Sequence, residues 1–173
     1  MKKLFLLGLV LVLFTACKKE EQRYFSESSE IEILKAGIKA YEAKDWDVWK
    51  SNFADTAKIY HNTDKGSAPD DVMKNFESML SNFSSYGFSD KGEFIEMVID
   101  KDQETWVNYW GHWNGKLLAN EKELHIPVHL TAQFINGKIV EEYAYYDTVS
   151  IVSALQDIEA EKMAIDAAEA TEE

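Results

Sequence analysis

Residues Glu123–Asp147, ELHIPVHLTAQFINGKIVEEYAYYD, contain the clearest strand and turn signals of this chain. Apolar and polar residues alternate on both sides of Asn136-Gly137, a pattern typical of strands with one buried face. An Asn-Gly pair between two such runs is the strongest short signal for a two-residue hairpin turn. The stretch therefore predicts two antiparallel strands, Glu123–Ile135 and Lys138–Asp147, joined in a tight hairpin.

Further strands are predicted before this hairpin. Glu93–Ile99 and Glu104–Trp113 have the composition of strands, and Asn114-Gly115 after the second predicts another turn. Earlier in the chain, apolar and polar residues alternate over Ala57–His61. This alternation predicts a short strand with Ile59 and His61 on one face.

Helical spacing governs the remaining segments. Ser29 and Glu32 have capping-box spacing, which predicts a helix over about residues 30–44, and Asp45 begins a short second helix. A third helix begins at residues 67–70, with a buried stripe that consists of Val72, Met73, Phe76, Met79, Leu80 and Phe83.

The last segment, Val149–Glu173, is rich in Ala and Glu and predicts a closing helix that ends in an acidic tail over residues 156–173. Three helices followed by a largely antiparallel sheet indicate an α+β fold in one domain, which we place at residues 30–155.

Composition excludes several classes of function. The chain has 173 residues, with 31 acidic and 18 basic side chains and a formal charge of −13. Since no basic patch is present to neutralise phosphates, we expect no nucleic-acid partner. The single cysteine, Cys17, excludes an internal disulfide and a thiolate metal cluster.

The amino terminus is typical of a bacterial export signal. Lys2 and Lys3 precede an apolar run, Leu4–Phe14, that is too short to span a bilayer. The following Phe14-Thr15-Ala16-Cys17 resembles the lipobox of bacterial lipoproteins, in which the signal is removed and the cysteine is acylated. The alternative is a plain secretory signal with an incidental cysteine.

We therefore predict a signal peptide over residues 1–16, lipidation at Cys17 and a flexible tether over residues 17–29. The expected location is the bacterial cell envelope, with the protein anchored by lipid to a membrane. The outer membrane is favoured, and the domain is expected in the periplasm or at the cell surface.

The chain resembles the nuclear transport factor 2-like superfamily, in its SnoaL-like and ketosteroid isomerase-like branch. The resemblance lies in Lys44-Asp45-Trp46-Asp47, Phe53-Ala54-Asp55, Phe134–Ile139 and Tyr145-Tyr146-Asp147. It implies a cone-shaped, curved antiparallel sheet wrapped around a long amino-terminal helix, with a pocket at the wide end. Because members of this superfamily have many different activities, the resemblance does not name a reaction.

The resemblance also indicates candidate catalytic residues. His61 and His129 occupy the places of the two catalytic carboxyl groups of ketosteroid isomerases, and Gly37 occupies the place of the tyrosine donor. Tyr41, one helical turn further on, could present a hydroxyl to the same space. Since the carboxyl groups are absent, the steroid isomerase reaction is not carried over. His61 and His129 would instead act as an acid–base pair.

The direction in which His129 points stays open at this stage. It shares a strand face with Gln133, while Val128 and Leu130 lie on the other face. If the apolar face covers the core, His129 points to solvent or to a second subunit. If the pocket is lined by polar groups, His129 points into it.

Aromatic side chains crowd the predicted strand Glu104–Trp113. They are either core and dimer contacts or the lining of a pocket for a flat or apolar molecule. For that pocket we predict the ligand-binding residues Tyr41, Trp46, Tyr109, Trp113 and Gln133. A glycine-rich phosphate loop and metal-binding motifs are missing from the sequence, so we expect no cofactor and no metal site.

These sequence features are compatible with three functions. The first is a membrane-anchored domain that binds a small apolar or aromatic molecule, and the second is an isomerase, dehydratase or cyclase using His61 and His129. The third is a non-catalytic accessory or interaction lipoprotein. A homodimer through the sheet is possible in each case.

Overall fold

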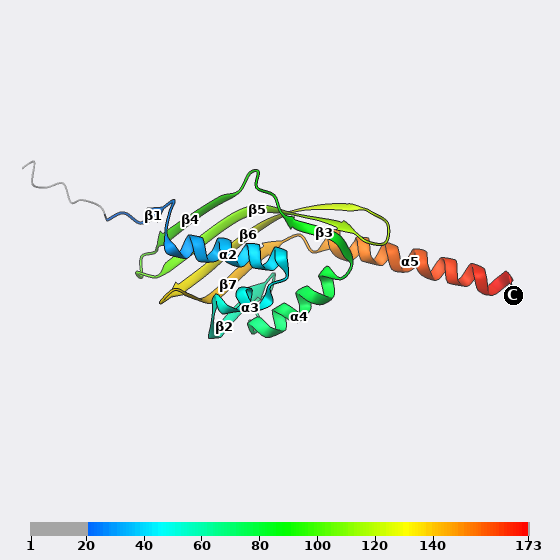
Figure 1. Ribbon diagram of the computed structural model, residues 1–173, viewed down its shortest axis with the longest axis horizontal. Helices are drawn as coiled ribbons and strands as arrows, with labels where there is room; N and C mark the ends of the chain where they lie inside the picture. Colours follow the sequence, from blue (N-terminus) through cyan, green and yellow to red (C-terminus); the bar gives the residue numbers. More distant parts are fainter. Residues whose placement is uncertain (1–20, 173) are drawn as a thin grey trace, which may run out of the picture.

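The computed structural model describes residues 21–172, and Figure 1 shows the arrangement of its elements. The helices are α2 (Ser29–Ala43), α3 (Trp46–Ser51), α4 (Pro69–Leu80) and α5 (Val149–Glu172). The strands are β1 (Tyr24–Phe25), β2 (Phe53–His61), β3 (Phe83–Phe88), β4 (Phe94–Ile99), β5 (Thr105–Leu117), β6 (Glu123–Ile135) and β7 (Lys138–Tyr146).

The strands form one curved sheet in the order β1-β4-β5-β6-β7-β2, with β3 paired to the far half of β5. Helices α2, α3 and α4 lie on one side of this sheet (Figure 1). The core forms between them from apolar side chains such as Leu34, Val107 and Ile126. The predicted α+β class and curved sheet are confirmed. The sheet is mixed, however, because β2 runs parallel to β7.

The predicted hairpin is present as β6 and β7. Asn136 and Gly137 have φ angles of 52° and 72°, and Ile135 pairs with Lys138 across the turn. Two consecutive positive φ angles are those of a type I′ turn, which favours Asn-Gly because few other residues adopt them without strain.

The predicted turn at Asn114-Gly115 is wrong, since both residues lie inside β5 and pair with β6. The chain reverses after Leu117, whose N–H donates to the carbonyl of Lys122. Gly115 serves packing instead: a Cβ there would lie 2.3 Å from the ring of Trp113. Tyr109 covers Gly111 in the same way, with its hydroxyl oxygen 2.3 Å from the position of a Cβ.

The helix boundaries differ from the prediction at two points. Helix α2 is capped by Ser28, not Ser29, because the Oγ of Ser28 accepts the N–H of Ile31. Helix α4 ends at Leu80, and Phe83, which was assigned to its buried stripe, begins β3.

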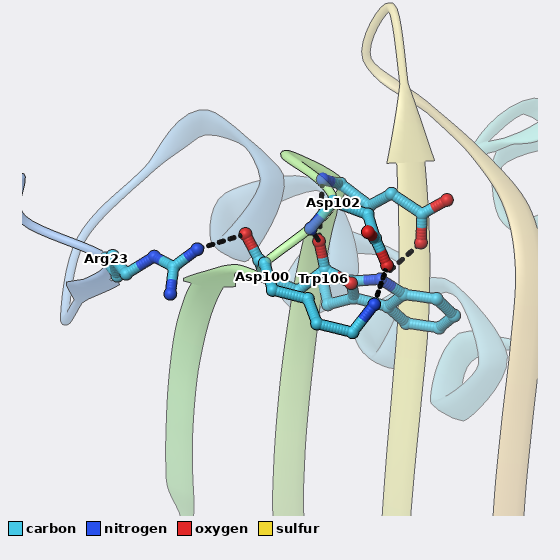
Figure 2. Close-up of polar contacts among 6 residues, drawn as sticks. Arg23, Asp100, Asp102 and Trp106 are labelled. Carbon is cyan, nitrogen blue, oxygen red and sulfur yellow. Dashed lines mark hydrogen bonds and ion pairs between the residues drawn. The ribbon is translucent and has the colours of Figure 1, made fainter.

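Part of the predicted tether is an ordered strand. Tyr24 and Phe25 form β1 on the edge of β4, and the N–H of Ile99 donates to the carbonyl of Arg23. Figure 2 shows the Arg23 guanidinium donating to the backbone carbonyl of Asp100, at 2.7 Å. The tight turn after β4 is held by the Asp100 carboxylate, which accepts the N–H groups of Asp102 and Glu104. The flexible segment predicted over residues 17–29 therefore does not extend through β1.

Helix α5 leaves the body of the domain and projects from it (Figure 1). Ile151 and Ala154 in its first turns are buried, whereas Met163 and Ile165 further along are exposed. Within residues 21–172, no helix combines the length and the apolar character needed to cross a membrane. Cys17 and the predicted signal peptide lie outside the described residues.

Candidate functional site

A cavity of about 110 Å³ lies between the helices and the inner face of the sheet. Its walls are mainly apolar and come from α2, α3 and α4 and from strands β2, β3, β5, β6 and β7, with Ile151 contributed by α5. The lining residues are Leu34, Gly37, Ile38, Tyr41, Trp49, Asn52, Phe53, His61, Phe76, Met79, Phe88, Trp113, Ile126, Val128, Leu130, Ile139, Glu142, Ala144, Tyr146 and Ile151. A cavity of this size and character suits an apolar molecule of about one ring.

One ionisable pair stands in this apolar wall. His61, the last residue of β2, places its Nε2 3.3 Å from Oε1 of Glu142 on β7. The side chains are 17% and 7% exposed, and Glu142 is the one charged residue that is buried among those whose exposure the structure describes. Phe76 and Tyr146 contact the imidazole ring from two sides, with ring centroids at 5.5 and 5.9 Å.

The sequence did not predict Glu142 at the cavity, because a bulge changes the alternation of β7. Ile139 pairs with Phe134, but the next pair joins Glu141 to Gln133, so one residue of β7 is extra. Strict alternation from Ile139 would turn Glu141 inward and Glu142 outward. The bulge reverses this, and Glu142 becomes the inward residue.

Tyr41 and Trp113 form a second polar contact at the cavity wall. The Nε1–H of Trp113 donates to the hydroxyl oxygen of Tyr41 at 3.1 Å. Burial raises the pKa of the Tyr41 hydroxyl far above its ordinary value, so the group stays protonated. Since its oxygen accepts from Trp113, the Tyr41 hydroxyl can still donate its own proton to a ligand.

Three other predicted ligand-binding residues do not line the cavity. Trp46 lies behind its wall, with its ring stacked 6.4 Å from Phe76 and edge-on to Tyr41. Tyr109 is 1% exposed and lies over Gly111, and its hydroxyl has no hydrogen-bond partner. Gln133 lies on the outer face of the sheet, paired in register with Trp106 and Glu141.

His129 also lies on the outer face, so the structure does not bring it together with His61. Ile126, Val128 and Leu130 of the same strand line the cavity, and alternation turns His129 away from it. The predicted pairing of His61 with His129 in one pocket is therefore wrong. His129 stacks between Trp110 and Tyr145, with ring centroids at 4.7 and 6.4 Å.

Burial in this stack has electrostatic consequences for His129. Its Nε2 is buried without a hydrogen-bond partner, and desolvation lowers the pKa of the imidazole below its ordinary value. The ring is therefore neutral at pH 7 and cannot act there as a charged donor. Among residues 21–172, no three His, Cys, Asp or Glu side chains gather in a way that would hold a metal ion.

We compared the sequence and the fold of this chain with those of known proteins. The sequence matches no family model and no curated protein. The fold, however, matches several solved structures at 12–14% sequence identity.

One neighbour is a candidate polyketide cyclase from Xanthomonas campestris pv. campestris, at 13% identity and a TM-score of 0.59, covering 72% of this chain and 95% of that one. A candidate SnoaL-like polyketide cyclase from Shewanella denitrificans OS-217 has 14% identity and a TM-score of 0.58, with 76% and 99% coverage. A protein of unknown function from Burkholderia pseudomallei K96243, described as nuclear transport factor 2-like, has 12% identity and a TM-score of 0.59, with 73% and 97% coverage. This chain has the nuclear transport factor 2-like fold that these solved structures share.

Proposed function

We propose that this domain binds a small, largely apolar molecule of about one ring in the cavity, and that a lipid on Cys17 holds it to a membrane of the bacterial cell envelope. The observation that carries the binding proposal is the mainly apolar cavity wall with two separate polar contacts. Apolar surface supplies most of the affinity of such sites, and a few fixed polar groups orient the ligand. Two of the neighbours are described as candidate polyketide cyclases, one of them SnoaL-like, and both are in keeping with a small-molecule site.

Binding is tested by titrating the ¹⁵N-labelled protein with benzene, phenol and indole while following amide and side-chain resonances. We expect saturable shifts at cavity residues, with a Kd of about 1 mM or lower for at least one probe. Ala144→Leu adds three carbon atoms inside the cavity and is expected to abolish these shifts. Ala119→Leu makes the same change on an exposed turn and is the matched control. Equal binding by the Ala144→Leu variant would place the ligand elsewhere.

A second candidate function is acid–base catalysis, favoured by the buried pair of His61 and Glu142. When the carboxylate accepts the proton on Nε2, Nδ1 carries the lone pair and can act as a base. The Tyr41 hydroxyl can donate to an oxygen that becomes negatively charged. Together these groups suit removal of a proton from a carbon next to a carbonyl, a step common to isomerases, dehydratases and cyclases.

This chemistry can be followed without knowing the natural substrate. In D₂O, proton abstraction and return exchanges the α-hydrogen of a ketone for deuterium, with no other reagent. We expect the protein to accelerate exchange in cyclohexanone, cyclohex-2-enone or acetophenone by about 10²-fold or more over the His61→Gln variant. Equal rates for the two proteins would leave only the binding function or the non-catalytic accessory role.

We further propose a second copy of the chain as the partner of the outer sheet face. Phe94, Trp110, His129 and Tyr145 face one another in register across four strands and form a continuous row of rings. This row, here called the outer ring row, carries no charged side chain at neutral pH. A chain with a charge of −13 can approach its copy most easily through such an uncharged patch.

The partner is tested by sedimentation analysis of the protein. We expect a dimer that Trp110→Ser converts to monomer, whereas Tyr24→Ser, a change at an exposed aromatic outside the row, leaves it intact. A monomeric native protein would contradict this proposal.

A further inference from the structure

Strand β2 carries His61 at its end, in a position that is intrinsically prone to fraying. It is the outermost strand on its side of the sheet and pairs with β7, while on its other edge Ile59, two residues before His61, exchanges two hydrogen bonds with Ser67. His61 is the last residue of that pairing, opposite Ala144. Terminal residues of edge strands open most easily, because few hydrogen bonds have to break. A further contact at this end would help to keep the imidazole beside Glu142.

Asn62 supplies that contact. Its Nδ2 donates to the carbonyl of Tyr146 at 2.8 Å, and its Oδ1 accepts the N–H of Tyr146 at 3.1 Å. Its own N–H donates to the carbonyl of Ala144 at 3.0 Å. The amide side chain thus pairs with the backbone of Tyr146 in the manner of another strand residue and extends the ladder by one step.

The backbone conformation of Asn62 explains why its side chain, and not the backbone of the next residue, pairs with Tyr146. Its φ angle of 51° turns the chain out of the strand and into the loop that follows. Asparagine tolerates this left-handed conformation better than most residues, and its amide both donates and accepts. Aspartate would keep the acceptor but lose the donor, and glycine would keep the backbone conformation but lose both.

We propose that Asn62 is a positioning residue that locks the end of β2 to the end of β7 and so holds His61 against Glu142. This inference rests on the proposed acid–base function, for which the imidazole must keep one orientation. The same clamp also fixes Tyr146, whose ring lies edge-on to His61 at 5.9 Å in the cavity wall. Asn62 itself is exposed and does not line the cavity.

The test is the tautomeric state of His61, read from two-bond ¹H–¹⁵N correlations of the ring in protein with ¹⁵N-labelled histidine. In the native protein we expect a single pattern, with the proton on Nε2. In Asn62→Gly this pattern should be lost in favour of averaged ring-nitrogen shifts. Asn62→Asp should give a partial loss, because one hydrogen bond remains.

The matched control is Asn136→Gly, which makes the same change at the other left-handed asparagine beside β7, at the opposite end of the strand. It should keep the native pattern. If the native protein shows one tautomer and both Asn62 variants keep it, the positioning role is wrong and the proposed pair survives. If the native protein itself shows averaged nitrogens, the pair of His61 and Glu142 fails, and this inference fails with it.

Discussion

Glu142 and His61 lie on neighbouring parallel strands, with 3.3 Å between Oε1 and Nε2, in a wall that is otherwise almost entirely apolar. Such a pair is costly to bury, because a buried carboxylate loses its hydration and its contact with one imidazole only partly compensates. A pair of this kind is weak support for stability and points instead to a role in the site.

The cost of burying Glu142 beside His61 predicts the outcome of a double-mutant cycle. His61→Phe alone should lower the free energy of unfolding by about 3 kcal/mol, since it leaves a buried carboxylate without its partner. Adding Glu142→Leu should restore native stability or exceed it. Urea denaturation of the native protein, the two single variants and the double variant measures the four free energies of unfolding. A double variant less stable than His61→Phe would show that the pair is kept for folding.

His129 predicts a dependence of stability on pH. Because burial lowers its pKa in the folded protein, the unfolded chain binds this proton at higher pH than the folded one. The stability associated with neutral His129 is complete above its ordinary pKa of 6.5 and is lost as the pH falls through 6.5 toward the folded pKa.

The variant His129→Phe should remove this loss between pH 7 and pH 5, and it should also relieve the unpartnered Nε2. His125→Phe serves as the control, because His125 is exposed and bonded to Asn114. Chemical denaturation at several pH values measures the free energy of unfolding of both variants and of the native protein. An unchanged pH profile in His129→Phe would contradict the assignment.

The contact between Tyr41 and Trp113 predicts the cost of removing one hydroxyl. Tyr41→Phe leaves the buried Nε1–H of Trp113 without an acceptor and should destabilise the protein by about 1–3 kcal/mol. Tyr60→Phe is a suitable control, since it removes a tyrosine hydroxyl on the outer side of the sheet. Similar unfolding free energies for Tyr41→Phe and the native protein would argue against a structural role for this bond.

The strand glycines predict a steric effect and its rescue. Gly111→Ala would place a Cβ 2.3 Å from the hydroxyl oxygen of Tyr109 and should cost about 1–3 kcal/mol. Combining it with Tyr109→Leu, which removes the overlying ring, should give less than the sum of the two separate losses. Urea unfolding of the single and double variants gives the coupling free energy between positions 109 and 111. Strictly additive losses would mean that the two residues do not interfere.

The fold was largely predictable because its signals are local. The alternation and the Asn-Gly turn define β6 and β7 through short-range sterics, and they were correct. Asn114-Gly115 has the same composition and yet lies within β5, because the rings of Trp113 and Phe83 cover the glycine. That covering depends on a neighbouring strand and is invisible in the local sequence.

The site was only partly predictable for the same reason. His61 was placed in the cavity because Ile59 shares its face, and alternation holds over that short strand. Glu142 was missed because a one-residue bulge in β7 reverses which face its side chain occupies. Asn62 was missed because its role depends on Tyr146, 84 residues further along the chain.

Strand β1 would set how far the domain could move from the lipid proposed on Cys17. Because Arg23 is already hydrogen-bonded to the edge of β4, only the five residues 18–22 separate the cysteine from the sheet along the sequence. Six peptide steps at roughly 3.5 Å each give a maximum reach of about 20 Å. An acylated protein would therefore stay close to the bilayer surface, with the β1 edge of its sheet nearest the lipid, and could meet only those molecules that come to the membrane.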